Sequence, residues 1–423
     1  MRVLVVSSEP LNPDDTLGST FELSQAKLLS KLYDVAILSV SEAVPIKQRL
    51  GAALKRRLAE PSGGYLKGLF QTGADFFKHV FGYREVRIHV IEGIAVYEGI
   101  SSRLTSETEF SAELKNWLAA ARAAFLKYRE ARGSPDLVHA HGRFLKAGVF
   151  ALENRKAARI PYIYTEHSSF FQRGWAPKIA QQTLLDVIRG AAVYSAVSRS
   201  LAKSVEAFLG TAVRKPEILP NVVDPAFERN PADFPSAPPF VFIQVASLDV
   251  NKGVDLLLRA FAKAFGTGPA CTLTICGDGP MRSELQALAE SLGISSAVRF
   301  AGKLTKDDVR RQIDNAHALV LSSRIETFGV VLIEALARGR PVIATRCGGP
   351  EDIVEAHNGI LVDCDNVPQL ADALQRMTRD AATYDRDGIR QVALRRYGAA
   401  AFLERMQPIY QHALAGGVVT LSA

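Results

Sequence analysis

Short apolar runs rich in β-branched residues alternate along the chain with longer stretches in which apolar positions recur at helical spacing. The short runs are typical of buried strands, and the longer stretches are typical of amphipathic helices. Because helical stretches lie between most of the predicted strands, the pattern indicates parallel sheets with helices packed on their faces. The predicted strands are Val3–Ser7, Val35–Val40, Leu137–Ala140, Tyr162–Thr165, Ala192–Val197, Phe240–Ala246, Cys271–Cys276, Val298–Ala301, Ala318–Leu321 and Val342–Ala344.

One proline-rich stretch divides this alternation in two. Residues 221–239 hold five of the chain's 20 prolines, a composition typical of an interdomain linker. We therefore expect two doubly wound α/β domains, at residues 1–222 and 240–399, with a linker at 223–239. The helical stretch at about 400–415 is expected to pack back on the first domain. Two open sheets joined in this way leave a cleft, where the carboxyl ends of both sheets meet a shared ligand.

Length and composition exclude several classes of protein. The chain has 423 residues, of which 48% are hydrophobic and 22% are charged, as in globular domains and unlike disordered chains. No apolar run approaches the roughly 18 residues that a membrane span requires. The N-terminus lacks the long apolar region of a secretory signal, so we expect a cytoplasmic protein. The four cysteines show no C-x2-C spacing, and we expect buried thiols.

The net charge of +7 is concentrated in one part of the chain. Residues 46–84 hold eight basic and two acidic residues, an excess of six positive charges. Apolar residues recur there every four positions, which fits either a basic helix on an anionic membrane surface or a core-packing helix with a solvated basic face. A peripheral location on the inner face of a membrane therefore stays open. No nucleic-acid partner is expected, since such a partner requires a basic groove interleaved with exposed aromatic residues.

The strongest signal for chemistry lies in residues 322–341. A buried strand ends just before this stretch, a polar loop carries Glu326, and an apolar helix is predicted at about 328–339. Glu334 lies inside that helix, where a carboxylate without a hydrogen-bond partner is costly. Glu334 therefore either pairs with Arg338, one turn later, or accepts hydrogen bonds from two ligand hydroxyls, as acidic residues do on a ribose.

The start of the same helix is a second candidate binding element. Its first backbone N–H groups point along the helix axis and can hold an anion or sugar oxygens. A glycine at this place lets a ligand approach closely. The residues concerned are Thr327, Phe328, Gly329 and Val330.

The spacing of Glu326 and Glu334, followed by Ala-Leu-Ala-x-Gly-x-Pro at 335–341, resembles the E-x7-E signature of the family 4 retaining glycosyltransferases of the GT-B fold. The resemblance implies two Rossmann-like domains that transfer a sugar from a UDP or GDP sugar to an acceptor hydroxyl with retention of configuration. It implies that Glu334 binds the donor ribose, that Glu326 is a catalytic residue beside the donor sugar, and that the backbone of 327–330 holds sugar and phosphate oxygens. The expected acceptor is lipid-linked or a glycan, in bacterial surface polysaccharide or glycolipid assembly.

Lys252 follows a predicted strand and precedes a predicted helix, where an ammonium group can neutralise a diphosphate. This stretch resembles the family's donor-binding loop, but Ser247 stands where the family usually has an arginine. A serine cannot replace the two phosphate hydrogen bonds of an arginine. Either another arginine compensates, or the donor is bound differently, or turnover is weak; we expect compensation. The candidates are Arg324, Arg199 and Arg143.

In the N-terminal half, glycine and histidine residues follow predicted strands at the expected cleft. Gly18 precedes a helix that opens with a capping-box pattern, and it resembles the family's phosphate-facing glycine loop. His141 and His167 lie at the carboxyl ends of two strands, and the resemblance places His167 beside the donor sugar as a second catalytic residue. His139 and Asn221 are expected to be structural, as a core histidine and a turn residue.

No metal and no other cofactor are expected. Asp363-x-Asp365 imitates the D-x-D motif of metal-dependent transferases, but it lies far from the inferred site, and GT-B enzymes are normally metal-independent. Glu326 and His167 are expected to orient the sugar, while the departing phosphate helps to deprotonate the acceptor. The alternatives are a transferase for a soluble acceptor, a nucleotide-sugar hydrolase or epimerase of the same fold, and a sugar-binding protein without activity.

Overall fold

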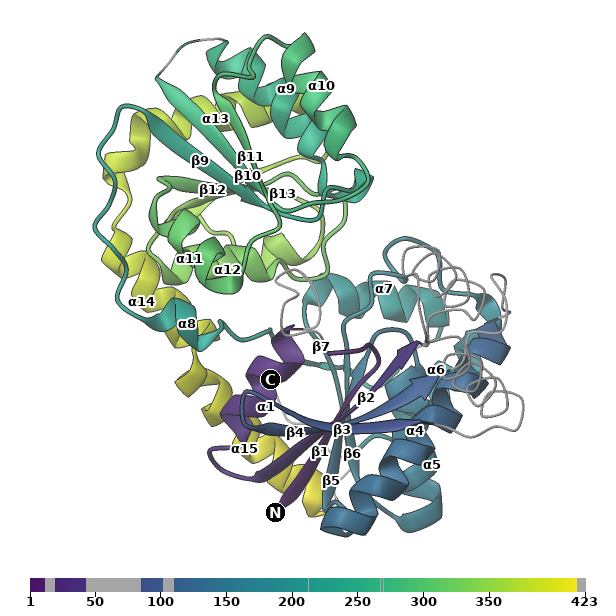
Figure 1. The fold of residues 1–423 in the computed structure, drawn as a ribbon. Coiled ribbons are helices and arrows are strands. Elements are labelled where there is room, and N and C mark those ends of the chain that lie inside the picture. Colours follow the sequence, from purple (N-terminus) through teal and green to yellow (C-terminus); the bar gives the residue numbers. More distant parts are fainter. Residues whose placement is uncertain are drawn as a thin grey trace, which may run out of the picture.

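The computed structural model shows two α/β domains, one above the other in Figure 1, each built on a mostly parallel sheet. The expected fold class, two doubly wound domains, is confirmed. Among the residues that the structure describes, no helix is both long enough and apolar enough to cross a membrane. The described residues are 1–11, 20–42, 85–101, 110–211, 213–266, 268 and 270–416.

The described residues of the N-terminal domain form an eight-stranded sheet. In chain order its strands are β1 (Arg2–Ser7), β2 (Asp34–Glu42), β3 (Val86–Ile91), β4 (Ile94–Ser101), β5 (Leu137–Gly142), β6 (Tyr162–Glu166), β7 (Val193–Ala196) and β8 (Glu217–Ile218). They lie in the order β3-β4-β2-β1-β5-β6-β7-β8. Every neighbouring pair is parallel except β3 with β4.

The antiparallel hairpin of β3 and β4 is an exception to the parallel arrangement that the alternating pattern indicated. Glu92 and Gly93 join the two strands directly, with φ angles of 48° and 86°. Positive φ at both positions is typical of a tight two-residue hairpin turn. A pattern of strands separated by helices does not predict this pair, because two residues and no helix connect its strands.

The C-terminal domain contains a six-stranded sheet in which every pair is parallel. Its strands are β9 (Phe240–Val245), β10 (Cys271–Cys276), β11 (Val298–Gly302), β12 (Ala318–Leu321), β13 (Val342–Thr345) and β14 (Gly359–Val362). They lie in the order β11-β10-β9-β12-β13-β14. The edge strand β14 was not among the predicted strands.

Helices cover both sheets (Figure 1). Those of the first half and the linker are α1 (Thr20–Leu29), α4 (Phe110–Arg132), α5 (Lys146–Ala158), η1 (Lys178–Ala180), α6 (Gln181–Gly190), α7 (Arg199–Leu209) and α8 (Pro225–Glu228). Those of the second half are η2 (Val250–Lys252), α9 (Val254–Phe265), α10 (Arg282–Ser291), α11 (Lys306–Asp314), α12 (Val330–Ala337), η3 (Gly349–Asp352), α13 (Val367–Asp380), η4 (Ala381–Thr383), α14 (Arg386–Tyr397) and α15 (Ala399–Leu414).

The last helix, α15, packs on the N-terminal domain, as the yellow ribbon in Figure 1 shows. Its apolar side chains belong to the same buried cluster as Val3 and Val5 of β1. Tyr410 is fully buried, and its hydroxyl lies 2.9 Å from Nδ1 of His139 on β5. The members of the cluster from α15 are Phe402, Met406, Ile409, Tyr410 and Ala413.

The chain therefore passes between the domains twice, once before α8 and once between α14 and α15. The two passages lie side by side, because the Val223 N–H donates to the Tyr397 carbonyl at 2.8 Å. Asp224, which caps α8, also has partners in both domains. Its carboxylate accepts hydrogen bonds from Ser24 on α1 at 2.7 Å and from Lys306 on α11 at 2.6 Å.

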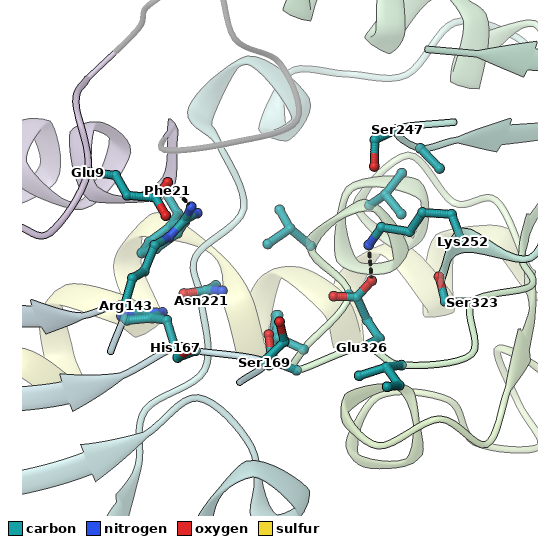
Figure 2. A pocket seen from close by; sticks show the side chains of 18 of the residues that line it. Glu9, Phe21, Arg143, His167, Ser169, Asn221, Ser247, Lys252, Ser323 and Glu326 are labelled. Carbon is teal, nitrogen blue, oxygen red and sulfur yellow. Dashed lines mark hydrogen bonds and ion pairs between the residues drawn. The ribbon is translucent and has the colours of Figure 1, made fainter. Parts of the chain in front are cut away.

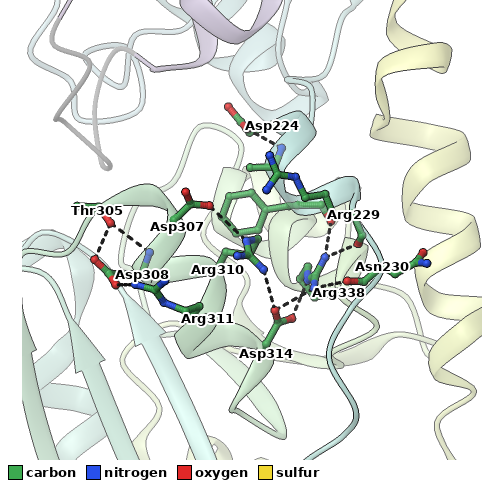
Figure 3. Close-up of polar contacts among 12 residues, drawn as sticks. Asp224, Arg229, Asn230, Thr305, Asp307, Asp308, Arg310, Arg311, Asp314 and Arg338 are labelled. Carbon is green, nitrogen blue, oxygen red and sulfur yellow. Dashed lines mark hydrogen bonds and ion pairs between the residues drawn. The ribbon is translucent and has the colours of Figure 1, made fainter.

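From α8 onward, the linker is fastened to the C-terminal domain by a fully buried arginine, Arg338 (Figure 3). Its guanidinium makes two parallel bonds to the Asp314 carboxylate, at 2.7 and 2.9 Å. It also donates to the backbone carbonyls of Phe227, Arg229 and Asn230 in the linker. These bonds satisfy a buried charge and fix the path of the linker.

Candidate functional site

A pocket of about 460 Å³ lies between the two domains, where the sequence predicted a cleft. Residues that directly follow the strands of both sheets line it. Arg143 and His167 come after β5 and β6 on one side, and Ala246 and Ser247 come after β9 on the other. The carboxyl ends of two parallel sheets therefore face each other across this pocket.

On the C-terminal wall, Lys252 and Glu326 form an ion pair inside the pocket (Figure 2). The Lys252 Nζ lies 2.7 Å from Oε2 of Glu326, and both side chains are largely buried. The Glu326 charge raises the pKa of Lys252, so the ammonium stays protonated. Gly253 permits this arrangement, because it has a φ of 60° and a Cβ there would lie 2.0 Å from the Ser322 carbonyl oxygen.

Ser247 lines the same wall without adding a positive charge. Its hydroxyl donates to the Asp249 carboxylate at 2.6 Å. Asp249 also caps η2, the short turn that ends at Lys252. Ser247 therefore supports the turn that presents Lys252.

Helix α12 directs its N-terminus and one carboxylate into the pocket. It begins after Gly329, whose φ of 97° is left-handed, and the segment 327–330 lines the pocket. Glu334 also lines it. Burial and the nearby Asp224 charge raise the pKa of Glu334 to about 8, while the Lys306 ammonium acts in the opposite direction.

The structure contradicts the alternative in which Glu334 pairs with Arg338. The Arg338 guanidinium donates to Asp314 and to linker carbonyls instead. The two residues are one turn apart in sequence, but the buried acid on α11 has the better geometry for the arginine. Glu334 lines the pocket instead.

On the N-terminal wall, His167 is buried and lines the pocket (Figure 2). Its Nε2 lies 2.9 Å from Nδ1 of His141, and Phe21 stacks on its ring at 4.4 Å. Burial lowers the pKa of both histidines, so both are neutral at pH 7. Glu166 fixes the loop, because its Oε1 accepts the backbone N–H groups of His167 and Ser168 at 2.9 and 2.7 Å.

His141 lies behind His167 and does not itself line the pocket. Its Nε2 and the Nδ1 of His167 are buried and have no partner among the described residues. His139, the third histidine of this group, contacts Tyr410 and Thr165 and belongs to the core. Only His167 of the three therefore reaches the ligand space.

Of the three arginines considered as compensation for Ser247, the structure places only Arg143 in the pocket. Arg143 forms an ion pair with Glu9 and lies over the Phe21 ring. Arg324 is directed away, since Asp255 and Asp365 hold its guanidinium at 2.9 and 2.8 Å.

Arg199 also lies outside the pocket and pairs with Asp352 at 3.1 Å. In both cases the guanidinium forms an ion pair with a carboxylate on another element. Neither of these two candidates for compensation therefore lines the pocket.

Two expected features lie outside the described residues. These are Gly18 and the basic stretch 46–84.

Asn221 lines the pocket, and its buried Oδ1 has no partner in the described part of the chain. No group of three or more potential metal ligands occurs among the described residues. Asp365 of the D-x-D stretch lies in a loop and pairs with Arg324.

Several pocket residues were not predicted from the sequence. Lys306 and Asp224 form an ion pair at 2.6 Å beside Glu334. Thr305, which caps α11, could have indicated from the sequence that a helix begins at Lys306 shortly after a strand. Arg173 and Phe170 line the pocket from the loop after β6. No motif marks them, because their place depends on how that loop turns.

Comparisons with known proteins match both domains to glycosyltransferase family models. Residues 227–391 match a family model described as Glycosyl transferases group 1. Residues 79–227 match a second model, described as Glycosyltransferase Family 4. The two matches adjoin at the linker.

The related proteins are only partly covered by the match. A glycogen synthase of Mycobacterium tuberculosis (strain H37Rv) is 27% identical over 259 residues, which are 60% of this chain and 62% of that protein. The lipopolysaccharide core biosynthesis glycosyltransferase LpsE of Rhizobium meliloti is 35% identical over 159 residues, or 37% and 44% of the two chains. One subunit of the human phosphatidylinositol N-acetylglucosaminyltransferase is 25% identical over 306 residues, or 70% and 60%. The chain thus spans less than two thirds of the length of these relatives.

Solved structures extend the likeness to the whole chain. A sucrose-phosphate synthase of Thermosynechococcus elongatus superposes with a TM-score of 0.73 at 17% identity, covering 98% of this chain and 100% of that one. HepE of Anabaena, in complex with UDP, superposes with a TM-score of 0.68 at 18% identity, covering 97% and 100%. At these identities the likeness establishes a common two-domain fold.

Proposed function

We propose that this chain transfers a sugar from a UDP or GDP sugar to an acceptor hydroxyl, with retention of configuration and without a metal. The premise is that it is a glycosyltransferase of the GT-B fold, since two glycosyltransferase family models match adjoining parts of it and solved structures share its two-domain fold. The observation that carries the proposal is the composition of the C-terminal wall. Lys252, Glu326 and Glu334 line one pocket together with the N-terminus of α12.

The proposed donor site divides the nucleotide sugar among these groups. Glu334 accepts hydrogen bonds from the ribose hydroxyls, and the Lys252 ammonium binds the diphosphate. The backbone N–H groups of 327–330 hold sugar and phosphate oxygens at the positive end of the α12 dipole. The Glu326 carboxylate, which pairs with Lys252 at 2.7 Å, stays beside the diphosphate and accepts a hydrogen bond from a sugar hydroxyl.

The proposed reaction replaces one bond at the anomeric carbon by another on the same face of the sugar. The bond from the anomeric carbon to the diphosphate oxygen breaks, and the acceptor oxygen forms the new bond. The proton of the acceptor hydroxyl passes to the departing phosphate oxygen, and the nucleoside diphosphate leaves. No side chain has to act as a covalent nucleophile in this scheme, and His167 orients the sugar from the opposite wall.

Positive charge on the protein makes this departure feasible without a metal. Negative charge grows on the diphosphate as its bond to the sugar breaks, and preorganised positive groups stabilise that charge. Lys252 and the α12 N-terminus provide such groups on the C-terminal wall.

The acceptor is proposed to be lipid-linked or a glycan. Support comes from two relatives, one named for lipopolysaccharide core biosynthesis and one named as part of a phosphatidylinositol N-acetylglucosaminyltransferase. A cytoplasmic protein that associates peripherally with a membrane fits such an acceptor.

Binding and transfer with a panel of UDP and GDP sugars test the proposal. The wild-type protein should bind one nucleotide and its sugar, and Lys252→Ala should weaken both about 10- to 100-fold through loss of a charge-assisted contact. Lys203→Ala, an exposed lysine on α7, should leave both unchanged. Transfer should persist in EDTA, and NMR should show the donor's anomeric configuration in the product. Unchanged affinity in Lys252→Ala, or an inverted product, would contradict the assignment.

A further inference from the structure

Arg173 differs from the other positive side chains that line the pocket. Four of these have a carboxylate partner, and Arg173 has none among the residues that the structure describes. Its Nε is buried without a hydrogen-bond acceptor in the described part of the chain. The four pairs are Arg143 with Glu9, Lys146 with Glu113, Lys252 with Glu326 and Lys306 with Asp224.

A partly desolvated guanidinium without an anion is unfavourable in a folded protein. Its planar set of donors matches the oxygens of a phosphate or carboxylate, which can accept two hydrogen bonds at once. The unpaired Arg173 therefore indicates an anionic group on a ligand of the pocket.

The position of Arg173 assigns that anion to the acceptor. Arg173 lies in the loop after β6, on the N-terminal wall, whereas the groups proposed to bind the donor lie on the C-terminal wall. The guanidinium is held over the Trp175 ring, with Cζ at 4.7 Å from the ring centre. Trp175 is 61% exposed, so Arg173 connects the pocket to a ring at the protein surface.

Next to Arg173, aromatic rings form a continuous strip from the pocket wall to the protein surface. Phe110 contacts Phe144 at 5.0 Å, Phe144 contacts Phe170 at 5.3 Å, and Phe170 contacts Trp175 at 6.0 Å between ring centres. The first three rings line the pocket. The last two are exposed, Phe170 by 39% and Trp175 by 61%. An apolar surface of this kind, rimmed by a cation, favours a ligand with an apolar part.

We propose that the acceptor is a phosphate-bearing lipid, whose phosphate binds Arg173 and whose apolar part lies along the strip of Phe144, Phe170 and Trp175. An exposed tryptophan beside an arginine is suited to such a ligand, because indole and guanidinium each combine an apolar face with polar edges. The proposal rests on the proposed function, since it names the acceptor class of that site.

Short-chain lipids test this directly, because the two tryptophans of the chain differ in exposure. Trp117 is 3% exposed and Trp175 is 61% exposed, so the change in fluorescence on binding reports on Trp175. The ligands are dihexanoyl phosphatidic acid, dihexanoyl glycerol and glucose 1-phosphate. Both lipids are used below their critical micelle concentrations. Phosphatidic acid should shift the emission to shorter wavelength and bind at least about tenfold tighter than the other two.

Arg173→Gln should weaken phosphatidic acid binding about tenfold or more, and Arg189→Gln, an exposed arginine on α6, should not. Thermal unfolding controls for folding of both variants. Unchanged affinity in Arg173→Gln overturns the proposal, as does glucose 1-phosphate binding as tightly as the lipid. A matching loss of UDP or GDP affinity in Arg173→Gln also overturns it, because the arginine would then serve the donor.

The donor titration separates the two proposals. A wild-type protein that binds neither UDP nor GDP contradicts the proposed function, whatever the lipid titration shows. A protein that binds a nucleotide and ignores phosphatidic acid retains the proposed function and loses this inference.

Discussion

Glu334 carries a carboxyl group whose charge depends on its surroundings in the pocket. Burial and the neighbouring Asp224 carboxylate raise its pKa to about 8. In the unliganded protein the group is therefore mostly protonated at neutral pH. Ligand hydroxyls that donate to a carboxylate favour its ionised form, so donor binding and proton release are coupled.

Donor affinity should therefore increase with pH. Between pH 7 and pH 8.5 the ionised fraction of a group with a pKa of about 8 grows about eightfold, and the association constant of the nucleotide sugar should grow by about the same factor. Titration calorimetry at the two pH values measures it. Glu334→Gln should abolish the increase, and Glu284→Gln, an exposed glutamate on α10, should retain it. An increase that survives in Glu334→Gln would show that another group titrates.

Sequence reasoning finds single residues that follow strand ends, but it does not find their partners. Lys252, Glu326 and Glu334 line the pocket as their positions in the pattern suggest. Arg324 has an equally favourable position, yet Asp255 and Asp365 draw its guanidinium away. Which carboxylate lies nearby depends on the packing of other elements, and the chain's local pattern does not contain that information.

Arg338 acts at the scale of elements, because it joins the end of α12 to α11 and to the linker. It is fully buried, and its ion pair with Asp314 is enclosed by protein. Breaking a buried pair by removing one partner leaves an uncompensated charge, which is far costlier than losing an exposed pair.

Arg338→Met should lower the free energy of unfolding by about 3 to 5 kcal/mol, because the Asp314 carboxylate and three linker carbonyls lose their donor. Urea unfolding followed by circular dichroism measures the change. The double variant Arg338→Met with Asp314→Leu should recover part of it, since both charges are then absent. A loss below about 1 kcal/mol in the single variant would mean that Arg310, at 3.3 Å from Asp314, suffices as a partner.

Elements differ in how well the sequence predicts them. The buried strands β10 and β12 begin and end where their apolar runs predict, because a strand covered on both faces needs an uninterrupted apolar run. Of the strands at the sheet edges, β11 was predicted and β3, β8 and β14 were not, and the interior strand β4 was missed as well. Ile88 and Val90 of β3 are exposed, so burial does not impose a readable pattern on this strand.

At the scale of the whole molecule, the last helix stabilises the domain that comes first in sequence. Tyr410 of α15 is fully buried among residues of the N-terminal domain, and its hydroxyl contacts His139. The two domains and their cleft follow from the alternating pattern. The sequence also led us to expect that the helix at 400–415 packs on the first domain. Its contacts with β5 are seen only in the folded structure.

Tyr410→Ala should destabilise the N-terminal domain by about 3 to 5 kcal/mol, because a large buried ring leaves a cavity when it is removed. Thermal unfolding followed by the fluorescence of the buried Trp117 measures this. Leu414→Ala, at a 41% exposed position on the same helix, should change the midpoint little. Equal midpoints for Tyr410→Ala and the wild type would contradict the packing of α15.

The hydrogen bond between Val223 and Tyr397 has an evolutionary consequence. Because both passages of the chain leave the N-terminal domain at one place, the segment 224–397 is an insertion into a continuous host domain that resumes with α15. A gene segment that encodes such an insertion can be exchanged as one cassette, without cutting the host sheet. On the proposed division of the pocket between a donor wall and an acceptor wall, donor choice and acceptor choice can then be inherited separately.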